Sequence, residues 1–147
     1  MGRTVARLGR QVEVALARVD LTIAQYRVLT QLTEGAEASS SLAAKLAVSR
    51  PSITAVVEGL VERGLVDRRH SAADRRRVSV SLTPAGEQVV ATADAAVGVK
   101  LGEMLTAVDS DQAELALAGL AQWGAAMDAK KARRQAAAAT AEPAVTA

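Results

Sequence analysis

Arginines are concentrated in one short segment of the chain. Residues 65–77 hold five arginines and two aspartates, so this segment carries a net charge of +3, whereas the whole 147-residue chain carries +2. The planar guanidinium group binds oxygen acceptors in pairs, which suits it to phosphate groups. The segment is therefore predicted to present a basic surface to an anionic partner, although a charged segment can also be a solvated turn without one.

A second group of polar side chains lies at the start of a predicted helix. Ser49 is a favourable N-cap and Pro51 fits the first turn, so we expect a helix over residues 50–63. Its apolar residues share one face, which leaves Arg50, Ser52 and Thr54 on the outward face. Hydroxyl and guanidinium groups at a helix N-terminus suit phosphates and base edges. The alternative is that Arg50 is merely exposed and Ser52 a redundant cap.

Helices are predicted before these residues. Apolar residues spaced by three or four predict helices over residues 3–19 and 23–34, the second starting at the capping-box pattern of Thr22 and Gln25. A short third helix is expected to begin at the N-cap hydroxyls of residues 39–41 and to end before a turn at Ala47 and Val48.

After residue 64 the apolar pattern changes to strict alternation. Residues 65–69 and 77–82 are predicted to form two strands, with residues 70–76 at the hairpin tip. A long helix is expected after Thr83 and Pro84, and another after residues 109–111. The segment 131–147 is basic and then Ala-rich, and we expect it to be disordered.

Two short helices joined by a tight turn and followed by a basic hairpin predict a winged helix-turn-helix unit that binds double-stranded DNA. The expected fold class is mainly α with a small β-hairpin wing (α+β). We expect an N-terminal dimerisation helix over residues 1–20, the DNA-binding unit over 21–86 and C-terminal dimerisation helices over 87–130. Three extra amphipathic helices need a surface to bury, which favours a homodimer.

Composition excludes several other classes of protein. There is no Cys and a single His, so a thiol nucleophile, a His-based dyad and a thiolate or His-rich metal site are excluded, and neither an enzyme nor a cofactor is expected. With one Tyr, one Trp and no Phe, the chain also lacks stacking platforms for single-stranded nucleic acid. No apolar segment is long enough to span a membrane, and a cytoplasmic protein is expected.

Several short motifs resemble the MarR family of transcriptional regulators. They are Leu21-Thr22 with residues 25–29, Leu42-Ala43, residues 49–54, residues 63–66, and Asp74-Arg75-Arg76 followed after five residues by Leu82-Thr83 and then Gly86. The resemblance covers residues 21–86. The remaining chain is similar to the family in layout only. Two residues depart from the family pattern: Ala55 stands where many relatives have a longer polar side chain, and Gly59 lies inside the helix that the family uses for recognition.

The resemblance implies a homodimeric regulator, usually a repressor, of a pseudo-palindromic operator. It implies that Ser49, Arg50, Ser52 and Thr54 of the recognition helix lie at the major groove, and that the wing contributes Asp74, Arg75, Arg76 and Arg77. Arg76 would enter the minor groove, and Asp74 would orient a wing arginine. The resemblance also implies a small-molecule effector, often an aromatic or phenolic acid. The alternative is a helical interaction module whose basic hairpin has no specific DNA target.

Overall fold

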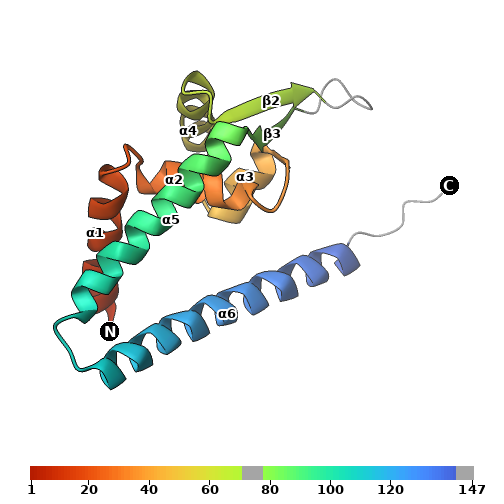
Figure 1. Cartoon of the computed structure of the whole chain (residues 1–147). Coiled ribbons are helices and arrows are strands. Elements are labelled where there is room, and N and C mark those ends of the chain that lie inside the picture. The colour runs from red at the N-terminus through yellow and green to blue at the C-terminus, as the bar shows by residue number, and fades with distance from the viewer. Residues whose placement is uncertain (71–77, 142–147) are drawn as a thin grey trace. The chain divides into compact units, whose positions relative to one another are not determined.

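Helices and one small sheet make up the described part of the chain, residues 1–70 and 78–141 of a computed structural model (Figure 1). The elements in order are α1 (Gly2–Ala17), α2 (Ile23–Leu32), β1 (Glu37–Ala38), α3 (Ser39–Leu46), α4 (Arg50–Glu62), β2 (Val66–His70), β3 (Val78–Leu82), α5 (Pro84–Leu105) and α6 (Ser110–Ala141). This order confirms the mainly α fold with a small β wing.

The N-terminal helices begin and end close to their predicted positions. At the start of α2, Thr22 Oγ1 accepts from the Gln25 backbone N–H and Gln25 Oε1 accepts from the Thr22 N–H, so the predicted capping box is present. The N-cap of α3, by contrast, is Ala38, without a side-chain cap. The prediction of a serine cap was wrong, because α3 already begins at Ser39 and the three serines lie inside its first turn. The Ser41 hydroxyl donates to Glu37 Oε2 at 2.6 Å.

The sheet has three antiparallel strands in the order β1-β3-β2. β2 pairs with β3 along its whole length, from Val66 opposite Leu82 to His70 opposite Val78. The short strand β1 pairs with the outer edge of β3 through Glu37 and Ala38. β1 was not predicted, because two residues are too few to show an alternating pattern.

One apolar core joins α1 to α4, the sheet and the first half of α5. Its largest fully buried side chains are Leu16, Leu29, Leu42, Leu60, Val28, Val57, Val66 and Val80. From α5, Val90 and Ala93 are buried and Val97 packs against the same core. The start of α5 therefore packs against the core of the winged unit, whereas Val99, farther along the helix, is 62% exposed.

The chain divides into two compact units, Met1–Glu103 and Met104–Ala147. The second unit contains α6, which is helical to Ala141. For residues 131–141 this corrects the expectation of a disordered segment 131–147, because the Ala, Lys, Arg and Gln residues there have high helix propensities; residues 142–147 lie outside the described residues. Within the residues that the structure describes, no helix is long and apolar enough to cross a membrane.

Candidate nucleic-acid interface

The first turn of α4 gathers the predicted recognition residues on one exposed end of the helix. Ser49 Oγ accepts from the Ser52 backbone N–H at 3.3 Å, and the two serine hydroxyls are 2.7 Å apart. Thr54 Oγ1 donates to the Arg50 carbonyl at 2.9 Å. All four side chains are exposed. Arg50 adds a full positive charge to the positive end of the helix dipole, so this end of α4 favours an anion such as phosphate.

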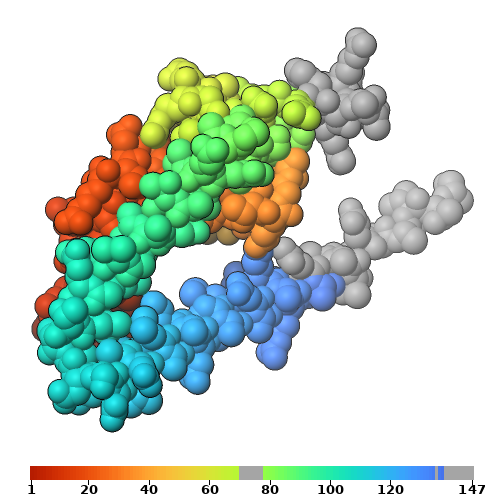
Figure 2. Space-filling view, in the orientation of Figure 1, coloured from red at the N-terminus to blue at the C-terminus, as the bar shows by residue number. Residues whose placement is uncertain are grey.

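Strand β2 carries two further arginines, of which Arg68 contacts α4. Arg68 and Arg69 are exposed, and Arg68 Nη2 lies 3.9 Å from Glu58 Oε1 of α4. This ion pair joins β2 to α4, and Figure 2 shows the part of the chain that contains these two elements in yellow-green. Because both partners are largely solvated, the pair contributes little to stability, but it brings the basic strand close to the helix.

The corner between α3 and α4 is held by backbone groups and by one side chain from α2. Ala47 adopts the left-handed conformation (φ 53°), at the turn that the sequence predicted, and the Val48 N–H donates to the Ala43 carbonyl at 3.0 Å. Arg27 Nη2 donates to the Leu46 carbonyl at 2.8 Å. Arg27 therefore caps the C-terminus of α3 and fixes the angle at which α4 leaves it. Sequence reasoning could not assign this role, because residues 27 and 46 are distant along the chain.

Glu37 anchors the other end of α3. Its carboxylate accepts hydrogen bonds from Ser41 and from Lys45 Nζ. Burial alone would raise the pKa of the Glu37 carboxyl, but the hydrogen bonds from Lys45 and Ser41 and the charge of Lys45 outweigh it and lower the pKa below its usual value. Strand β1 is thereby attached to α3 by a charged contact.

The base of the wing is fixed to the end of α4 by a compact junction. Thr83 Oγ1 donates to the Gly64 carbonyl at 2.7 Å and accepts from the Gly86 N–H at 3.0 Å. The Thr83 N–H donates to the Leu65 carbonyl at 3.1 Å. A methyl group at position 86 would lie 2.1 Å from the same Leu65 oxygen, so only glycine allows α5 to start this close to the wing.

The predicted wing residues Asp74, Arg75, Arg76 and Arg77 lie outside the described residues. The flanking strands β2 and β3 are in place, so the hairpin starts and returns where the alternation predicted. Among the described residues there is also no group of three or more His, Asp or Glu side chains arranged to hold a metal ion.

Comparison with known proteins identifies this arrangement. The MarR family model matches residues 21–78. The HTH-type transcriptional regulator ML2140 of Mycobacterium leprae is 34% identical over 112 residues, which cover 76% of this chain and 78% of that protein. The chain belongs to the MarR family. As a MarR family transcriptional regulator it is a DNA-binding regulator and not an enzyme.

Solved structures of other MarR family proteins share the fold. The transcriptional repressor CouR, solved in complex with a 23-mer DNA duplex, is 30% identical, with a TM-score of 0.68 over 84% of this chain and 88% of that one. MarR from E. coli in its apo form is 24% identical, with a TM-score of 0.72 over 83% of this chain and 94% of that one. The likeness to E. coli MarR shows that this chain has the winged-helix fold.

Proposed function

We propose that this MarR family protein is a homodimeric repressor that reads a pseudo-palindromic operator through α4 and the wing, and that a small molecule releases it. The observation that carries the proposal is the exposed start of α4, where Ser49, Arg50, Ser52 and Thr54 gather at a helix N-terminus. Farther along the same helix, Glu58 pairs with Arg68 of β2. A relative of the same fold, CouR, was solved in complex with a DNA duplex.

The recognition residues are assigned to different parts of the DNA. Arg50, Ser52 and Thr54, with Ser49 as the N-cap, are proposed to lie at the major groove, where hydroxyl and guanidinium groups read base edges. The wing residues Asp74, Arg75, Arg76 and Arg77 are proposed to lie at the minor groove and its phosphates, with Arg76 inserted. A palindromic site then requires the two α4 helices of a dimer to be about 34 Å apart.

Exposed apolar side chains support the homodimer. On α5 and α6 they include Val99, Met104, Leu117, Leu120, Trp123 and Met127, each at least 42% exposed. None of the described residues of α6 is buried. An isolated helix with an apolar stripe is only marginally stable in water, so a second copy that covers it is favoured. We accordingly keep residues 1–20 and 87–130 as the proposed dimerisation segments.

Binding to an operator selected from genomic DNA tests the proposal. We expect Arg50→Ala and Arg76→Ala each to weaken operator binding by about 1–3 kcal/mol, measured by fluorescence anisotropy. Arg134→Ala, which removes an exposed arginine of α6 outside the proposed dimerisation segments, is the matched control and should change affinity little. Equal affinities for all three variants would contradict the assignment of α4 and the wing.

The salt dependence of the same binding separates the proposal from its alternative. If the arginines neutralise phosphates, the logarithm of the affinity falls linearly with the logarithm of salt concentration, by about 0.9 for each phosphate contacted. Removal of one phosphate-contacting arginine then lowers this slope. A protein with no salt-dependent affinity for any duplex would instead be the helical interaction module that the sequence leaves as the alternative.

A further inference from the structure

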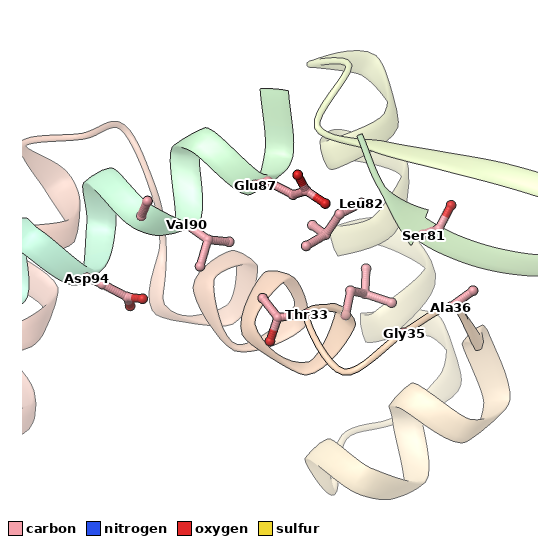
Figure 3. Close-up of a pocket in the computed structure, with 10 residues that line it drawn as sticks. Thr33, Gly35, Ala36, Ser81, Leu82, Glu87, Val90 and Asp94 are labelled. Atoms are coloured by element: carbon pink, nitrogen blue, oxygen red, sulfur yellow. The ribbon is translucent and has the colours of Figure 1, made fainter. Parts of the chain in front are cut away.

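A cleft opens within the first unit, between the end of α2 and the start of α5. Its volume is about 500 Å³, which lies in the range of sites that hold small organic molecules. The loop that follows α2 and the end of β3 complete its walls. Figure 3 shows Glu87, Val90 and Asp94 along α5, with Thr33 at the end of α2 and Leu82 of β3 beside them. The cleft therefore borders both the winged unit and the long helix α5.

The side chains that line the cleft are apolar, neutral polar or negatively charged. Leu32, Leu82 and Val90 supply apolar surface, whereas Glu87 and Asp94 supply two carboxylates. None of the described residues that line the cleft is Lys, Arg or His. An aromatic acid placed here would bring a third negative charge beside two others, with no cation to compensate. An apolar body that carries a positive charge complements the same lining.

Asp94 has a second role in this part of the fold. The Tyr26 hydroxyl donates a hydrogen bond to Asp94 Oδ1 and so joins α2 to α5. Burial of the Tyr26 ring, together with this hydrogen bond and the nearby Asp94 charge, raises the pKa of the phenol to about 12. Asp94 is thus both a wall of the cleft and the acceptor that connects the two helices. A cation that pairs with this carboxylate offsets its negative charge and so weakens the hydrogen bond that the Tyr26 hydroxyl donates to it.

We propose that the cleft binds an organic cation with an apolar body, and that this cation pairs with Asp94, weakens its hydrogen bond with Tyr26 and loosens the contact between α2 and α5. The effect on DNA, though not the binding itself, rests on the proposed function. Glu87 is the second charge partner of the cation. The site would select cations over the aromatic and phenolic acids that the family resemblance implies.

Two probes of similar size test the charge preference in the protein without DNA. Benzyltrimethylammonium is permanently positive, and phenylacetate is negative at pH 7.5. By isothermal titration calorimetry we expect the cation to bind at least tenfold more tightly than the anion. Glu87→Gln should weaken cation binding about two- to fivefold, as for an exposed charge pair. The control Glu62→Gln, which removes an exposed carboxylate at the end of α4, should not. Equal binding of both probes, or no effect of Glu87→Gln, overturns the assignment.

The effect of the cation on the hydrogen bond between Tyr26 and Asp94 can be measured by absorption spectroscopy. Tyr26 is the single tyrosine of the chain, so its near-ultraviolet difference spectrum reports this hydrogen bond at neutral pH. Saturation with benzyltrimethylammonium should shift the tyrosine band to shorter wavelength, and the shift should be absent in Tyr26→Phe and strongly reduced in Asp94→Asn. If the cation saturates the unsubstituted protein and the tyrosine band does not shift, the proposed effect on the hydrogen bond between Tyr26 and Asp94 is overturned.

DNA binding then distinguishes this inference from the proposed function. We expect saturating benzyltrimethylammonium, but not phenylacetate, to change operator affinity at least threefold. A protein that binds the operator and ignores the cation contradicts the cleft assignment alone. A protein that binds the cation and shows the tyrosine shift but binds no operator contradicts the proposed function and supports the cleft.

Discussion

At the scale of single residues, two glycines of the winged unit have opposite surroundings. Gly86 lies in the first turn of α5, where an added methyl group would overlap the Leu65 carbonyl oxygen and crowd the Leu82 side chain. Gly59 lies inside α4, and beyond its chain neighbours and the nearby backbone of its own helix no atom lies within 4 Å of the position such a methyl would take. The first glycine is required by a close approach of two backbone segments, whereas the second only costs helix stability.

Substitution of these glycines by alanine should therefore change stability in opposite directions. We expect Gly86→Ala to lower the free energy of unfolding by about 1–3 kcal/mol, because the α5 start must move away from the wing base. Gly59→Ala, the matched control, should raise it by about 0.5–1 kcal/mol, because alanine restricts the unfolded chain and favours helix. Urea denaturation followed by circular dichroism measures both, and destabilisation of the same size in both variants would contradict the junction.

The candidate site shows at the same scale which side chains a sequence reveals. Ser49, Arg50, Ser52 and Thr54 were predictable because capping preference, Pro51 and apolar spacing all locate the start of α4. The tie from Arg27 to Leu46 and the hydrogen bond from Tyr26 to Asp94 were not predictable. Both join residues far apart in the chain, and no local pattern of the sequence pairs Arg27 with Leu46 or Tyr26 with Asp94.

At the scale of elements, strong periodicity made most helices and both wing strands predictable. The predicted and observed elements differ where local sequence patterns are weak or compete with one another. The two-residue strand β1 has no pattern of its own and exists because its edge pairs with β3. The start of α3 has three serines as candidate caps, but the helix already begins at Ser39, so all three lie inside its first turn. The extension of α6 to Ala141 rests on helix propensity alone, without an apolar stripe that would predict it.

The charged contact between β1 and α3 should make stability depend on pH. Because the pKa of Glu37 is lowered in the folded protein, its contribution to stability is complete above the ordinary glutamate pKa and is lost as the pH falls through the lowered value. The free energy of unfolding should therefore decrease less steeply below about pH 5 in Glu37→Gln than in the unsubstituted protein. Glu62→Gln, at an exposed position, should retain the original steepness, and identical pH profiles for all three proteins would argue against the contact.

At the scale of the whole molecule, the two units differ in how they bury apolar surface. The unit Met1–Glu103 contains all the buried apolar residues of the described chain, from Ala15 to Ala93. The unit Met104–Ala147 contains a long helix whose large apolar side chains are exposed. The unit Met1–Glu103 thus closes its own core, whereas the exposed apolar side chains of α6 favour a further surface, which a second copy can supply.

A charge placed on this exposed apolar stripe should impair the proposed dimer. Leu120→Asp would bury an unpartnered carboxylate, so we expect the dimer dissociation constant to rise at least about tenfold, as measured by sedimentation velocity. Gln122→Asp adds the same charge about 200° around the helix and should leave association intact. An undisturbed dimer in Leu120→Asp would remove the proposed role of α6.

The two reporter rings of the chain belong to different units: Tyr26 to the first and Trp123, 63% exposed, to the second. Light of a wavelength that only indole absorbs therefore excites Trp123 of α6 and no other side chain, so no attached dye is needed. Pairing of subunits through α6 would move Trp123 emission toward the blue and protect it from acrylamide quenching, whereas the absorption of Tyr26 reports events at the contact between α2 and α5. The unlabelled protein can thus report assembly and ligand capture through separate optical channels.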